Sequence, residues 1–70
     1  MPRLTSASAA TLDALNPRHR AALVLRYLDG CDVPFVAVSL GITVDAAESV
    51  LVRARAAFRR EWTARNGVFR

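Results

Sequence analysis

The sequence is short of the residues that most often carry chemistry: its 70 residues include one cysteine, Cys31, and one histidine, His19. A single cysteine cannot form an internal disulfide, and these two residues cannot supply the three or four ligands of a zinc site. We therefore expect no metal and no other cofactor, and the cytoplasm as the compartment. His19 has no nucleophile or acid partner for catalysis, and Cys31, which falls between two expected helices, is assigned no role.

Long apolar runs are also missing. The longest, residues 21–25 and 33–38, are far too short to cross a bilayer, and residues 1–10 have no apolar stretch of signal-peptide length. A glycine-rich phosphate loop, a pair of carboxylates and a nucleophile with a neighbouring base are absent as well. We expect neither a membrane partner nor an enzyme.

Lysine is absent, so all ten basic residues are arginines. Residues 1–52 carry four arginines against five acids, whereas residues 53–70 carry six arginines against Glu61 alone, so the net charge of +4 lies in the last quarter. Concentrated positive charge attracts phosphate backbones or anionic membrane surfaces. The same charge also fits a solvated helix face, so it does not decide between these interpretations.

The length allows one domain, residues 1–70, and an apolar fraction of 53% is enough to pack one modest core, which we expect over about residues 8–64. Cap-competent residues precede two leucines spaced three apart, which predicts a short first helix over about 8–15. Asn16 can cap a second helix, and Pro17 fits its first position. The apolar spacing from residue 21 to residue 28, followed by Gly30, predicts that this helix spans about 17–29.

Asp32 and Pro34 favour a third, short helix over about 33–40, because proline is tolerated in a first helical turn. Gly41 then breaks the chain, and Thr43 can cap a longer fourth helix over about 44–64, which ends near residues 66–67. One apolar stripe follows this helix, and we expect it in the core: Ala47, Val50, Leu51, Ala54, Phe58 and Trp62. The predicted fold is all-α, with four helices.

The stretch from about 33 to 54 has the spacing of a DNA-binding helix-turn-helix. Ala37 is small enough for two helices to cross closely, Gly41 makes the turn, and apolar residues fill the angle between the helices. The second helix would then offer its outward side chains to base edges: Asp45, Ala46, Glu48, Ser49, Val52 and Arg53. A plain helical hairpin fits the same short pattern.

The wider sequence is more specific. Three pieces, Leu15-Asn16-Pro17 with the run from Arg20 to Leu28, Leu40-Gly41-Ile42-Thr43-Val44, and Arg53-Ala54-Arg55, together resemble region 4 of extracytoplasmic-function sigma factors. The resemblance extends over residues 12–60. It implies a promoter-recognition domain of an alternative sigma factor, which reads the minus-35 element through the helix 44–64 and docks on the flap of the RNA polymerase beta subunit. Promoter DNA and RNA polymerase core are the implied partners, with an anti-sigma factor or other regulatory protein as a further one.

The candidate DNA contacts fall into three groups. Ser49 and Arg53 match family positions that face DNA. Arg55 and Arg59, further along the helix, would attract phosphates regardless of sequence, and Arg18 and Arg20 at the start of the second helix could hold a phosphate there. For each arginine, a solvated surface position is the alternative.

Several residues depart from the family pattern. Glu48 and Val50 stand where basic residues are usual, Val52 replaces a polar residue, and Phe35 and Val38 make the third helix more apolar than expected. These departures favour a second hypothesis, a degenerate region 4 that binds a protein partner and has little sequence-specific affinity for DNA. Seventy residues cannot also hold the region that binds the minus-10 element, so we expect either an excised domain or a stand-alone relative.

Overall fold

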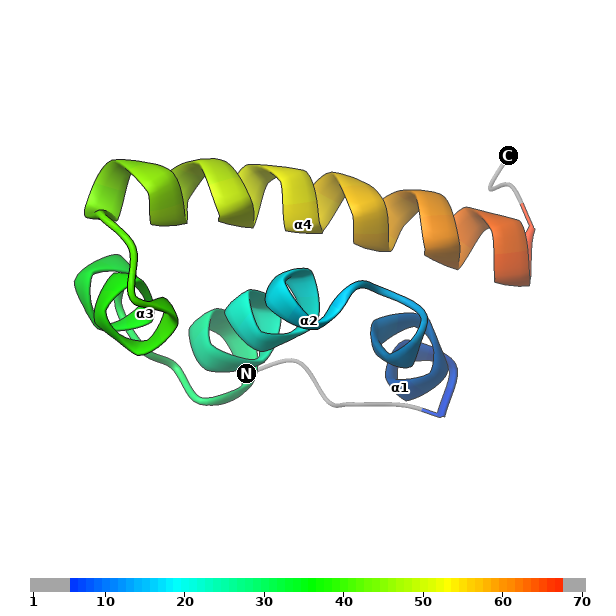
Figure 1. Cartoon of the computed structure of the whole chain (residues 1–70). Coiled ribbons are helices and arrows are strands. Elements are labelled where there is room, and N and C mark those ends of the chain that lie inside the picture. The colour runs from blue at the N-terminus through cyan, green and yellow to red at the C-terminus, as the bar shows by residue number, and fades with distance from the viewer. Residues whose placement is uncertain (1–5, 68–70) are drawn as a thin grey trace.

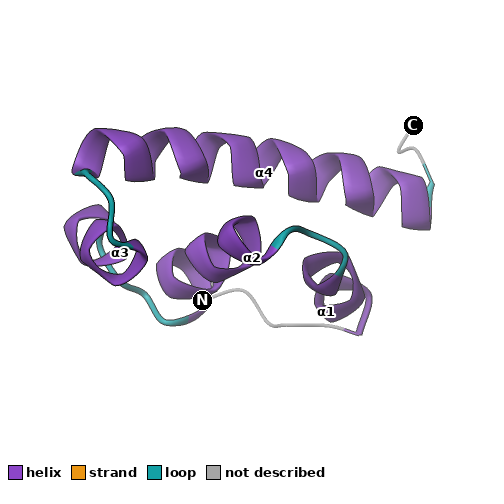
Figure 2. Ribbon diagram, in the orientation of Figure 1, coloured by secondary structure: helices purple, strands orange, loops and turns teal. Residues whose placement is uncertain are grey.

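The computed structural model describes residues 6–67. This part of the chain forms the helices α1 (Ser6–Asp13), α2 (Pro17–Leu23), α3 (Val33–Leu40) and α4 (Val44–Asn66), and a π-helical segment, η1 (Val24–Leu28), which continues α2. Figure 1 shows α4 along one side of the molecule, with α3, α2 and α1 side by side against it. The all-α prediction is confirmed for the described residues, which contain no strand (Figure 2).

Side-chain caps set the start of three helices. The Asn16 side chain accepts from the backbone N–H of His19 at 2.8 Å, and Asp32 accepts from Phe35 at 3.0 Å. Thr43 caps α4 in the same way, accepting from the N–H of Ala46 at 3.1 Å. Each cap satisfies a backbone donor that has no partner within its helix, so local sequence fixes where α2, α3 and α4 begin.

The first helix lies two residues earlier than its predicted range of 8–15. Thr11, one of the cap-competent residues, lies inside the helix and is fully buried, and its hydroxyl donates to the carbonyl of Ala7 at 2.7 Å. Leu15 lies beyond the helix end but is still buried. Of the two leucines, Leu12 is thus partly buried within the helix, and Leu15 reaches the core from beyond the helix end.

The second helix, predicted over about 17–29, is helical to Leu28, but its second half is π-helical rather than α-helical. After Leu23 the backbone widens into η1, where the N–H of Asp29 bonds to the carbonyl of Val24 at 2.9 Å, and the helix ends at Leu28. Gly30 follows with a left-handed φ of 72°. Single π-helical turns often occur at functional positions in helices.

α3 and α4 form the predicted helix-turn-helix. Their axes turn by 96° across residues 41–43, and Gly41 makes the turn at a φ of 69°. Such an angle and a short glycine-containing turn are typical of this motif. The helices cross closely because small side chains meet there, and the cluster that joins them to α2 is Ala22, Val36, Ala37, Ala47, Val50 and Leu51.

A second cluster, made of Leu15, Leu23 and Ala54, holds α1 and α2 against the middle of α4. Phe58 packs at its edge, and its ring stacks on that of Trp62 with centroids 6.2 Å apart. Both aromatic side chains are only partly buried, so the expectation that they are core residues holds in part. α4 itself continues to Asn66, two residues past the predicted range of about 44–64 and at the end predicted near residues 66–67.

Within residues 6–67 no single helix is long and apolar enough to cross a membrane. Only α3 and α4 taken together, as a bent pair, have the length and composition of a membrane-spanning segment, and buried core helices can have the same length and composition.

Candidate nucleic-acid interface

α4 has one covered face and one open face. Its covered face is the stripe that starts with Ala47 and passes through Val50, Leu51 and Ala54, all of them buried against the three short helices. The open face of its first turns consists of exposed side chains: Asp45, Glu48, Ser49, Val52 and Arg53. α3 packs under this segment at an angle of 96° to α4. The first turns of α4 therefore lie with α3 at one end of the molecule (Figure 1).

The candidate residues on α4 fall on different sides of the helix. Ser49 and Arg53 are four residues apart and therefore share one face. Arg55 lies about 200° around the helix from Arg53, since each residue advances about 100°. The Arg55 guanidinium turns toward η1, where its Nη1 donates to the hydroxyl of Tyr27 at 2.6 Å. Ser49 and Arg53 can thus contact one ligand together, whereas the Arg55 side chain points to another part of the surface, beside η1.

Arg18 and Arg20 lie at the start of α2, toward the other end of the molecule. Arg18 is exposed, and Arg20 is half-buried and donates to the carbonyl of Asp13 at 3.4 Å. The Asn16 side chain already accepts a hydrogen bond from the N–H of His19, so this backbone donor at the N-terminus of α2 is not free to bind a phosphate. The structure does not bring these two arginines together with Ser49 and Arg53.

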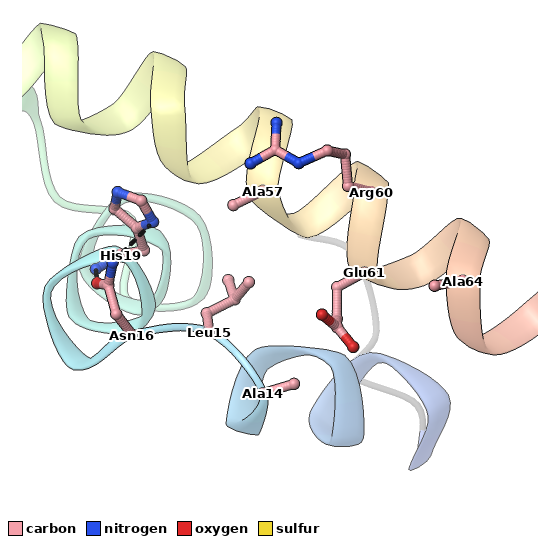
Figure 3. A pocket seen from close by; sticks show the side chains of 8 residues that line it. All are labelled: Ala14, Leu15, Asn16, His19, Ala57, Arg60, Glu61 and Ala64. Atoms are coloured by element: carbon pink, nitrogen blue, oxygen red, sulfur yellow. Dashed lines mark hydrogen bonds between the residues drawn. The ribbon is translucent and has the colours of Figure 1, made fainter.

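A hollow lies between the α1–α2 connection and the later turns of α4, and Figure 3 shows its side chains. Apolar groups form part of its lining, with polar side chains of α2 and α4 around them: Ala14, Leu15, Asn16, His19, Ala57, Arg60, Glu61 and Ala64. Asn16 and His19 also approach each other through their side chains at 3.3 Å. No group of three or more potential metal ligands comes together anywhere in residues 6–67.

The comparison with protein families decides what this arrangement is. The sequence model of the family described as Sigma-70, region 4 matches residues 9–58, which is more than half of the chain. This chain belongs to the sigma-70 region 4 family. No curated protein and no solved structure gives a match.

Region 4 is a DNA-binding, helix-turn-helix domain of sigma factors that works with RNA polymerase, and it is a regulatory domain rather than a catalytic one. The match includes α3 and the first turns of α4, where Ser49 and Arg53 lie. It ends at Phe58, so Arg59 and the later arginines of α4 lie beyond it.

The helix-turn-helix end of this region 4 domain is acidic. Between Arg26 and Arg53 the chain has no basic residue, while its four carboxylates there are all exposed: Asp29, Asp32, Asp45 and Glu48. Apart from Arg53, the arginines of α4 lie in its later turns, so charge is separated along a molecule that measures 36 × 21 × 20 Å. The acidic end is unfavourable for contact with phosphates.

The same end exposes apolar side chains. On α3, Val38 is 78% exposed and Phe35 is 53% exposed, and on the open face of α4 Val52 is 58% exposed. These three and exposed Glu48 are departures from the family pattern that lie at the surface, whereas Val50, which also departs from that pattern and was counted with the outward surface, is buried in the core. Isolated surface hydrophobics are common, but three large ones on the two helices of one motif point to a contact with another molecule.

Sequence analysis missed one group of residues. Tyr27 receives the hydrogen bond from Arg55, and the Arg26 guanidinium lies over the Tyr27 ring, 5.7 Å from its centroid. Tyr27 and Arg55 are 28 residues apart in the chain. No local pattern signals this pairing, which depends on how η1 turns against α4.

Proposed function

We propose that this region 4 domain, residues 1–70, is the promoter-recognition domain of an alternative sigma factor of the extracytoplasmic-function type. In this proposal the first turns of α4 enter the major groove of the minus-35 element during transcription initiation. The observation that carries it is that Ser49 and Arg53 lie together on the open face of α4, which follows α3 after a turn of 96°. A domain that binds RNA polymerase in this way would be located in the cytoplasm.

The chemistry of the two residues suits this role. A major groove about 12 Å wide admits one helix, and the side chains near its N-terminus reach the base edges. Arg53 has five N–H donors and can bind a guanine at two atoms or a phosphate, and the Ser49 hydroxyl can donate or accept. Arg18, Arg20, Arg55 and Arg59 would add contacts to phosphates, which strengthen binding without selecting sequence.

The test is fluorescence anisotropy with the 70-residue chain, using a duplex enriched from a random library and a scrambled duplex of equal composition, at two salt concentrations. Arg53→Ala should weaken binding to the enriched duplex by about 1–3 kcal/mol if Arg53 reads a base, with a smaller loss on the scrambled duplex. Arg65→Ala is the matched control, because Arg65 lies three turns further along α4 and pairs with Glu61 at 3.1 Å. Equal affinity for both duplexes, unchanged by Arg53→Ala, would overturn the proposal.

For RNA polymerase, we propose that the side of the domain away from the helix-turn-helix end docks on the beta flap. The hollow between the α1–α2 connection and α4 supports this, because its apolar lining can receive an apolar side chain. Ala64→Arg, at an exposed position of the lining, should weaken binding of the isolated flap domain. Ala10→Arg, exposed on α1 and outside the hollow, should not.

A second candidate function is a region 4 domain that binds a regulatory protein, such as an anti-sigma factor, in place of reading DNA. The observation that favours it is the exposure of acidic and apolar side chains at this end of the domain: Glu48 and Val52 on α4, and Phe35 and Val38 on α3. Acidic and apolar groups on one end complement a partner helix with basic and apolar residues. Titrating such a helical peptide while recording amide NMR spectra should shift signals of α3 and early α4, whereas shifts spread over α1 or their absence would exclude this candidate.

A further inference from the structure

We infer that Arg26, Tyr27 and Arg55 form a phosphate clamp at the seam between η1 and α4, which holds the DNA backbone beside the reading helix. The inference rests on the proposed function and adds a second contact point on a different element. Arg55 Nη1 donates to the Tyr27 hydroxyl at 2.6 Å, and the Arg26 guanidinium stands 5.7 Å from the centre of the same ring. We call these three side chains the seam cluster.

The seam cluster consists mainly of hydrogen-bond donors. Each arginine has five N–H donors and no acceptor. Arg26 uses one of them on the carbonyl of Cys31 at 3.3 Å, and Arg55 uses one on Tyr27. Because the tyrosine oxygen already accepts from Arg55, its own proton remains to be donated outward. A ligand for this cluster must therefore supply several acceptor atoms, as a phosphate group does.

The charges of the cluster point to an anion as well. Two guanidinium groups approach one tyrosine, yet neither forms an ion pair within residues 6–67, where the single ion pair joins Arg65 to Glu61. Like charges beside the same ring repel each other, and the attraction of both to a bound anion would offset that repulsion. Tyr27 is 38% exposed and Arg55 is exposed, so a phosphate can reach them.

The place of the cluster fits the backbone of a bound duplex. Arg55 lies ten residues after Asp45 and so about 15 Å further along α4. When the first turns of α4 occupy a groove about 12 Å wide, this position lies at the edge of the groove, where its phosphates run. η1 brings Arg26 and Tyr27 to the same place from a second element. Two elements that grip one strand would fix how far α4 enters the groove.

The experiment measures anisotropy with the 70-residue chain on the enriched and the scrambled duplex over a series of salt concentrations. Arg26→Gln and Arg55→Gln should each weaken binding to both duplexes alike and reduce the slope of log affinity against log salt by about 1. Tyr27→Phe keeps the charge, so we expect a loss of about 2- to 10-fold on both duplexes with the slope unchanged. In the Tyr27→Phe background, Arg55→Gln should cost less than it does alone, because Tyr27 positions Arg55.

Arg65→Gln is the control for charge alone, since it removes an arginine about 15 Å further along α4, beyond the range of unscreened attraction at physiological salt. Circular dichroism melts of every variant confirm that the fold is kept. If the wild-type chain selects the enriched duplex and the three cluster variants match wild type in affinity and slope, the clamp is refuted while promoter reading stands. If neither duplex is preferred but the cluster variants still weaken both, promoter reading fails and the clamp is supported.

Discussion

Val36→Ala tests whether the crossing of α3 and α4 depends on the packing described above. Val36 is fully buried at the centre of the cluster that joins α2, α3 and α4. The change removes two carbons from the core, which costs about 1.6 kcal/mol in lost burial at 0.8 kcal/mol per carbon. A cavity in a tightly packed crossing adds to this, so we expect a total loss of about 2–3 kcal/mol.

Such a loss is large for a chain of this size. Seventy residues give an expected free energy of unfolding of roughly 4–10 kcal/mol, so Val36→Ala removes about a fifth or more of it. The melting temperature should fall by about 10–20 °C. The assay is thermal and urea unfolding followed by circular dichroism, where the urea midpoint should fall and the slope of free energy against urea should stay the same.

Val38→Ala supplies the matched control, because it makes the same substitution two residues further along the same helix at a side chain that is 78% exposed. We expect its effect on the free energy of unfolding to stay within about 0.5 kcal/mol. If the two substitutions destabilise the protein equally, α3 does not bury the face assigned to it, and the helix-turn-helix packing is wrong.

Three further predictions concern the turn and the open face of α4. Thr43→Ala should lower the free energy of unfolding by about 1 kcal/mol in urea titrations, since it removes the cap on Ala46, whereas Thr43→Ser should retain most of it. Gly41→Ala should cost about 1–2 kcal/mol in the same assay: no atom crowds the added carbon, but φ is 69°, so a loss near zero would show that the turn adopts another conformation. Glu48→Gln should raise affinity for duplex DNA about 1.5- to 5-fold at low salt by anisotropy, because it removes a carboxylate from the open face, and an unchanged affinity would place Glu48 away from the phosphates.

Helix starts and stops were predictable because they depend on neighbouring residues. Asn16, Asp32 and Thr43 each cap a donor three residues later, and Gly30 and Gly41 take the left-handed conformation that ends a helix. The bounds of α3 and the first residue of α4 were therefore correct to the residue. The α1 region offered several cap-competent residues in a row, and nothing local told which of them would cap and which would be buried.

The features that sequence reasoning missed depend on contacts between distant segments. η1 has the same apolar spacing as a regular helix, so its wider turns have no local signal in the sequence. The hydrogen bond between Arg55 and Tyr27 could not be foreseen for the same reason. Among the candidate contacts, the sharing of one face by Ser49 and Arg53 follows from helix geometry alone, whereas the turning of Arg55 toward η1 does not.

The separation of charge along the molecule has a consequence for how the domain meets DNA. Its acidic helix-turn-helix end and the arginines of later α4 give it an electric dipole along its longest dimension of 36 Å. In the field of a duplex, we expect the domain to approach with the later turns of α4 leading, and the proposed contacts Ser49 and Arg53 to reach the DNA afterwards. Salt should therefore act mainly on the rate of association, while substitutions at the acidic end should act mainly on how long the complex lasts.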